Sequence, residues 1–113
     1  MTENMVSAED TFTPDVVTTR NDALHRYELH VGGTLAVRTR FIDKPGHVDF
    51  VHTETDDAFR GQGLAKVLIH FALDDVVASG KRIIPHCPFT ARYLRKHEVY
   101  TQCIDWPEGE PGA

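Results

Sequence analysis

One stretch of the sequence joins a basic side chain to two glycines at the start of a helical pattern. Arg60, Gly61, Gln62 and Gly63 come directly before Leu64, where the apolar periodicity of a helix begins. The first backbone N–H groups of a helix have no partner within it and lie at the positive end of its dipole. Because glycine lets a ligand approach the backbone closely, we predict an anion site here, with diphosphate as the best-fitting ligand.

The spacing of this loop separates it from two better-known phosphate loops. GQGLAK does not match GxxxxGK[ST], and Lys66 replaces the third glycine of the dinucleotide fingerprint GxGxxG. A tight turn between a strand and a helix is the simplest alternative, since glycine is common in turns. The charged fork of Arg60 favours an anion site over a bare turn.

Cys87 is the second candidate for chemistry. It follows a short apolar strand pattern and precedes a helical pattern that begins near Pro88. A helix N-terminus and a neighbouring histidine, here His86, both favour the thiolate form of a cysteine. Cys87 is therefore a candidate nucleophile or proton donor, and the alternative is that it fills space as a small apolar side chain.

The same region contains residue types that bind zinc. His86, Cys87, His97 and Cys103 are potential ligands, but no CxxC or HxxxH pair occurs among them. Zinc sites built on paired ligands usually show such close spacing. We therefore predict no metal site.

The candidate residues need strands and helices to position them, and the first half of the chain predicts strands. Apolar residues alternate on both sides of the glycine pair at 32–33, which predicts a β-hairpin. Its apolar members are Tyr27, Leu29, Val31, Leu35, Val37 and Phe41. After a turn at 43–46, residues 47–55 predict a third strand, in which Val51 is out of phase and indicates a bulge. An antiparallel meander follows from this pattern.

The hydrophobic period changes to that of a helix at Leu64. One amphipathic helix is predicted from there to about Ser79, with Gly80 as its cap. Its apolar face is predicted to contain Leu64, Val67, Leu68, Phe71, Ala72 and Val76. Residues 81–88 then predict a short strand, and residues 88–97 a second helix. Because the first helix crosses over between two strands, these strands should be parallel neighbours, which makes an α/β fold with a mixed sheet.

Composition limits the class of protein. With 113 residues, 41% hydrophobic and 26% charged, the chain is long enough for one soluble domain. We expect a flexible arm over residues 1–20, ending in a short strand at most, a domain over 21–106 and a flexible tail over 107–113. The formal net charge of −5 and the lack of a basic block argue against nucleic-acid binding. With no signal or membrane-spanning pattern, we expect a cytoplasmic protein that is a monomer or weak dimer and binds no membrane.

The glycine loop resembles a motif of the GNAT superfamily of N-acetyltransferases. RGQGLA is similar to the superfamily's motif A, [QR]xxGx[GA], through Arg60, Gly63 and Ala65 in register. In that superfamily the loop grips the diphosphate of acetyl-coenzyme A at the start of the helix that follows a bulged strand. The resemblance therefore implies acetyl-coenzyme A as the cofactor.

Two further motifs are similar to a compact, single-domain branch of this superfamily. They are HTE at 52–54 and PHCPFTARYLRKH at 85–97, and the resemblance covers most of residues 23–103. It implies a GNAT-like sheet, mixed but mostly antiparallel, with a central crossover helix and a second short helix. The chain lacks the helices that shape the acceptor pocket in most members, so the acceptor substrate cannot be carried over.

The resemblance also implies roles for single residues. The expected cofactor-binding residues are Thr53, Arg60, Gly61, Gln62, Gly63, Leu64 and Ala65, with Lys96 as a weaker partner for the 3'-phosphate. Glu54 or His52 would take the proton of an acceptor amine, although either could be an ordinary solvated side chain. Cys87 matches the suspected active-site cysteine of the compact branch, and Tyr93 is the alternative proton donor if it is not simply part of the core.

Three functions remain open at this point. The first is an acetyltransferase that uses acetyl-coenzyme A to acetylate an unidentified amine. The second is a non-catalytic module that binds acyl-coenzyme A or coenzyme A. The third is an interaction domain whose loop stays empty.

Overall fold

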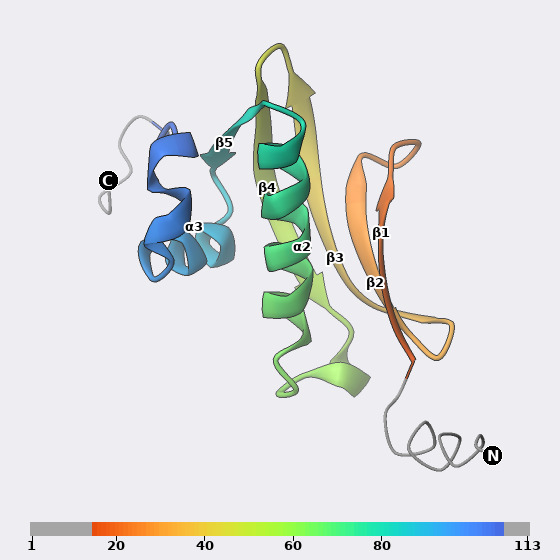
Figure 1. Ribbon diagram of the computed structural model, residues 1–113. Coiled ribbons are helices and arrows are strands. Elements are labelled where there is room, and N and C mark those ends of the chain that lie inside the picture. Colours follow the sequence, from red (N-terminus) through yellow and green to blue (C-terminus); the bar gives the residue numbers. More distant parts are fainter. Residues whose placement is uncertain (1–14, 108–113) are drawn as a thin grey trace, which may run out of the picture.

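The computed structural model describes residues 15–107 as one mixed sheet with two α-helices (Figure 1). The strands are β1 (Val16–Asn21), β2 (Arg26–Val31), β3 (Thr34–Lys44), β4 (His47–Thr55) and β5 (Arg82–Pro85). The helices are α2 (Leu64–Ala78) and α3 (Pro88–Arg95), and the short 3-10 helices η1 (Asp57–Phe59) and η2 (Glu98–Cys103) follow β4 and α3. The α/β fold expected from the sequence, a mixed sheet with a crossover helix and a second short helix, is confirmed.

The strands lie in the sheet in their order along the chain, β1-β2-β3-β4-β5. The first four form the antiparallel meander, and β4 and β5 are parallel, as the crossover through α2 requires. β1 is the short strand expected at the end of the arm, so the sheet begins before residue 21. The rest of the predicted arm and tail, residues 1–14 and 108–113, lies outside the described residues.

The bulge predicted in the third strand is confirmed at Val51. Arg40 pairs with His52 and Phe41 with Phe50, which leaves Val51 without a partner on β3. Beyond the bulge, Thr53 and Thr55 share the face of Val37 and Phe41, whereas His52 and Glu54 share the opposite face. The bulge therefore decides which side chains of the strand end face α2.

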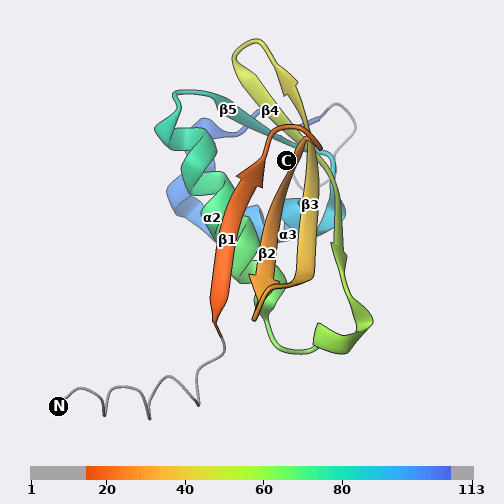
Figure 2. The same cartoon turned by 90° about the vertical axis from the view of Figure 1, so that its right-hand side faces the viewer.

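Both α-helices lie on one side of the sheet, with α3 beside α2 and next to β5 (Figures 1 and 2). The core between α2 and the strands includes Tyr27, Phe50, Leu68, Ile69 and Leu73, none of them exposed. Burying each such side chain stabilises the fold by about 1.5–3 kcal/mol relative to leaving it in water. Together these contacts fix the N-terminus of α2 against the end of β4.

Two apolar residues lie on other faces than the sequence predicted. Val67 is 46% exposed, because the buried face of α2 is turned toward Ile69 and Leu73. Leu35 pairs with His30 instead of continuing the face of Val37, because the β2–β3 register shifts at a second irregularity. Neither change moves the candidate site.

Candidate functional site

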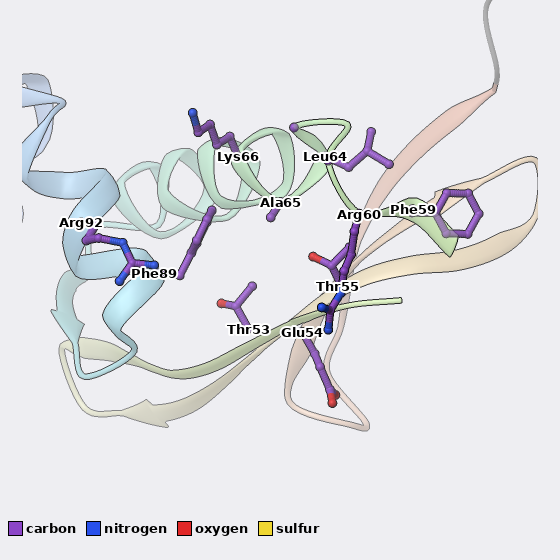
Figure 3. Close-up of a pocket in the computed structure, with 12 residues that line it drawn as sticks. Thr53, Glu54, Thr55, Phe59, Arg60, Leu64, Ala65, Lys66, Phe89 and Arg92 are labelled. Carbon is purple, nitrogen blue, oxygen red and sulfur yellow. The ribbon is translucent and has the colours of Figure 1, made fainter. Parts of the chain in front are cut away.

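A cleft of about 630 Å³ lies between the end of β4, the glycine loop and α3. Its lining residues are Thr53, Glu54, Thr55, Phe59, Arg60, Gly61, Gly63, Leu64, Ala65, Lys66, Phe89 and Arg92 (Figure 3). The structure thus brings together the strand end and the loop that the sequence predicted to bind a ligand. Of the expected loop residues, Gln62 is exposed and does not line the cleft.

The loop presents backbone N–H groups to this cleft. Gly61 and Gly63 have φ angles of 81° and 75°, in the left-handed region that favours glycine. Gly63 is the N-cap of α2 and provides no side-chain cap. Within residues 15–107, no hydrogen bond engages the N–H groups of residues 61–63, and those of the first helical turn lack intrahelical partners. These donors are available to an anion.

Space and charge at the loop also fit an anionic ligand. A Cβ atom built on either Gly61 or Gly63 meets nothing within 4 Å, so the backbone is open to a ligand on that side. Arg60, Lys66 and Arg92 border the cleft, although the whole chain carries a formal charge of −5. Arg60 is 72% exposed and forms an ion pair with Asp57 at 3.0 Å, which holds its guanidinium near the loop. The residues present therefore fit a diphosphate.

The cleft continues into a smaller hollow that contains Lys96. This hollow has a volume of about 100 Å³ and shares Lys66, Phe89 and Arg92 with the cleft. Lys96 is therefore next to the cleft but not part of its lining. Its neighbour Arg95 lies 5.4 Å from the ring of Trp106.

Cys87 lies beneath the cleft, at the N-cap of α3. Its side chain is buried, with 3% of the residue exposed, and its Sγ atom lies 3.3 Å from Thr53 Oγ1. The Thr53 hydroxyl also lies 2.8 Å from the hydroxyl of Thr39. The thiol is therefore the last group in a row of hydrogen-bonding side chains that runs from β3 through β4 to the start of α3. Cys87 is therefore close to the strand end but does not line the cleft.

The two candidate bases of β4 point away from Cys87. Glu54 turns to the face opposite α2, where Arg38 donates to its carboxylate (Figure 3). His52 lies on that same face, beside Arg40 in the strand register. The structure thus separates these two side chains from the thiol by the thickness of the sheet.

Tyr93 belongs to a polar cluster between α2 and the C-terminal segment. Its hydroxyl lies 3.3 Å from His70 Nδ1, and the Tyr100 hydroxyl donates to Asp74 at 2.6 Å. Burial, followed by the charge of Asp74, raises the pKa of the Tyr93 phenol, which therefore keeps its proton at neutral pH. Tyr93 lines the smaller hollow. Within residues 15–107, no hydrogen bond joins it to Cys87.

Sequence reasoning missed four lining residues, Thr55, Phe59, Lys66 and Phe89, and the pair formed by Asp49 and His86. Thr55 shares a strand face with Thr53, so alternation along the strand could have identified it. Phe59 lies in the 3-10 turn before the loop, where no periodic signal exists. The hydrogen bond between His86 and Asp49, at 2.7 Å, joins residues 37 positions apart and depends on strand register.

Two absences concern metals and membranes. In the part of the chain that the structure describes, no group of three or more His, Cys, Asp or Glu side chains could hold a metal ion. No helix among residues 15–107 is both long and apolar enough to cross a membrane.

Known proteins resemble this chain in fold and in part of its sequence. A ribosomal-protein-alanine N-acetyltransferase from Brucella melitensis biovar Abortus 2308 aligns with a TM-score of 0.52 and 21% identity, over 75% of this chain and 66% of that one. This likeness shows the fold. Protein NATD1 of Homo sapiens and that of Mus musculus are each 40% identical over 52 residues, or 46% of this chain.

The chain spans about half the length of these curated relatives, 46% and 47% respectively. A family model described as GCN5-related N-acetyl-transferase matches residues 26–103. That match covers more than half of the chain and includes every element from β2 to η2. The chain therefore belongs to the GCN5-related N-acetyl-transferase family.

Proposed function

We propose that the protein binds acetyl-coenzyme A in the cleft and transfers the acetyl group to an amine. One observation carries the proposal: the unpartnered N–H groups of residues 61–63 open onto a cleft bordered by arginine and lysine side chains. Membership of an acetyltransferase family supports the same assignment. The amine acceptor remains to be identified.

Different parts of the cleft suit different parts of the cofactor. The N–H groups of Gly61 to Gly63 and of the first turn of α2 would hold the diphosphate, with Arg60 supplying a charged fork. Thr53 and Thr55 would flank the arm that carries the thioester. Lys96 and Arg92, at the adjoining hollow, would face the 3'-phosphate.

Transfer needs a proton donor for the departing coenzyme A thiolate. Cys87 and Tyr93 are the two candidates that the sequence suggested, and Cys87 is the nearer to the strand end because it contacts Thr53. Cys87 could instead carry the acetyl group briefly as a nucleophile. We place Cys87 in the reaction and leave these two roles to experiment.

The competing function is a module that binds the cofactor without transfer. Two observations favour this binding module. Cys87 is buried, and the Glu54 carboxylate is held by Arg38, so neither candidate catalytic group is free to meet a substrate. The two functions make the same prediction for cofactor binding and opposite predictions for amine acetylation.

Calorimetric titration with acetyl-coenzyme A tests the binding step. Gly63→Glu places bulk and negative charge at the loop, and Gly46→Glu is its matched control in the β3–β4 turn. Both glycines have a φ of 75° and open space around a built Cβ, so both variants should lose similar stability, about 1–2 kcal/mol. We expect native protein and Gly46→Glu to bind, and Gly63→Glu to lose binding. Equal binding by both variants, or none by folded native protein, contradicts the proposal.

A further inference from the structure

Asp49 and His86 form a pair in which a buried carboxylate supports an exposed imidazole. The Asp49 side chain is 3% exposed, whereas that of His86 is 53% exposed. His86 Nδ1 lies 2.7 Å and 2.9 Å from the two carboxylate oxygens of Asp49. Lys44 Nζ lies 3.3 Å from one of these oxygens and adds a cationic partner.

The pair lies where β4 and β5 separate. Asp49 is opposite Ile84 in the parallel register, and the Cys87 N–H then donates to the Phe50 carbonyl at 2.8 Å. Phe50 faces the core, so its neighbour Asp49 lies on the sheet face opposite α2. Beyond this point β5 ends and only β4 continues, with Cys87 and Thr53 in contact on the α2 side.

The hydrogen bond fixes the tautomer of the imidazole. A carboxylate only accepts hydrogen bonds, so His86 Nδ1 must carry the hydrogen, and in the neutral ring Nε2 has the free lone pair. A buried carboxylate behind a histidine holds the ring in place and stabilises the imidazolium once a proton has been taken up. The ring can therefore accept a proton on its exposed side.

We propose that His86 is the general base for the acceptor amine, with Asp49 as its positioning residue, and that the amine arrives on the sheet face opposite α2. This inference rests on the proposed acetyl transfer. His86 Nε2 takes one proton from the ammonium form of the acceptor, and the freed nitrogen lone pair bonds to the thioester carbonyl carbon. The carbon–sulfur bond breaks with its electrons on sulfur. The thiolate takes a proton from its donor, Cys87 in the proposed function, and the second amine proton restores that donor. His86 returns its own proton to water.

The other candidate bases on this face are less well arranged. Glu54 is engaged by Arg38. His52 is exposed, and within residues 15–107 no hydrogen bond or ion pair orients its ring. Among the described histidines of this face, His86 has the shortest contact to a buried carboxylate, 2.7 Å to Asp49, whereas His30 lies 3.8 Å from Glu28 and is less exposed.

The first test compares two asparagine variants by the release of coenzyme A thiol from acetyl-coenzyme A. His86→Asn keeps a donor near the position of Nδ1 but removes the basic Nε2, and His30→Asn is the control on the same sheet face. The acceptors are ethylamine, which arrives as an ammonium ion, and trifluoroethylamine, which is largely unprotonated at neutral pH. We expect His86→Asn to lower kcat about 100-fold with ethylamine and much less with trifluoroethylamine. Binding of acetyl-coenzyme A and the melting temperature should stay at the native values.

Asp49→Asn tests the positioning role. It should lower kcat in the same amine-dependent way but less steeply, about tenfold, with an unchanged KM for acetyl-coenzyme A. An equal fall with both amines would mean that Asp49 only supports the fold, which overturns its assigned role. If this buried substitution prevents folding, the His86→Asn result alone decides the inference.

The remaining outcomes separate this inference from the proposed function. Full activity of His86→Asn, or a fall caused by His52→Asn instead, overturns the assignment of the base while acetyl transfer stands. Native protein that binds acetyl-coenzyme A but acetylates neither amine overturns transfer, and this inference with it. An intact native rate together with an amine-dependent loss in His86→Asn supports both.

Discussion

The β4–β5 pair is fastened at one end and separated at the other. At the fastened end His47 lies opposite Arg82, and both side chains bind the carboxylate of Asp105, at 2.7 Å and 2.8 Å. At the other end, here called the separated end, the Cys87 N–H donates to the Phe50 carbonyl, β5 gives way to α3, and β4 runs on to the cleft. The same two strands therefore end in two different environments.

The two ends differ in how many of their polar groups form hydrogen bonds within the chain. Arg82 donates to Asp105 and to the carbonyls of Gln102 and Ile104, so the fastened end is largely self-satisfied. At the separated end, the N–H groups of residues 61–63 have no described partner. Donors without an internal partner are available to a ligand. Changes at the fastened end should thus affect stability, and changes at the separated end should affect binding and transfer.

The largest effect is expected from Cys87→Ala at the separated end. If the thiol donates a proton or carries the acetyl group, its loss should lower amine acetylation about 100-fold and leave cofactor affinity unchanged. Cys103→Ala is the matched control, because this second free thiol is only partly buried and lies outside the cleft. Acetylation is measured as acetyl-coenzyme A consumption with ethylamine, and binding by calorimetry. Native rates in Cys87→Ala would mean that the thiol only fills space.

A pair of arginine variants tests the contrast between the two ends with one type of substitution. Arg60→Ala removes a charged group at the loop and should weaken acetyl-coenzyme A binding about tenfold, with little change in melting temperature. Arg82→Ala removes the donors that fasten Asp105 and should lower the melting temperature with unchanged cofactor affinity. Titration calorimetry and thermal unfolding of both variants provide the comparison. A loss of affinity in Arg82→Ala would show that the two ends are coupled.

The sequence could predict the features that depend on contiguous residues but not those that depend on strand register. The loop at 60–65 and the helix after it are contiguous, so motif and periodicity were enough to place both. The side chains around the strand end depend on register, and the bulge at Val51 decides their faces. A shift of one residue moves a side chain across the sheet, so the sequence could not show that Glu54 and Cys87, both catalytic candidates, lie on opposite sides. The Asp49–His86 pair was missed for the same reason.

The smallest effect is expected from Asp105→Asn at the fastened end, and it depends on pH. Hydrogen bonds from Arg82, and then from His47, hold the pKa of Asp105 well below its ordinary value. Because the folded-state pKa is the lower one, this carboxylate stabilises the fold above the ordinary aspartate pKa of about 4, and that contribution is lost as the pH falls through the folded-state value. Asp105→Asn should therefore melt earlier than native protein at neutral pH, and the gap should narrow below about pH 4. Thermal unfolding over a pH series measures this gap, and a gap that does not change with pH would assign the loss to packing rather than to charge.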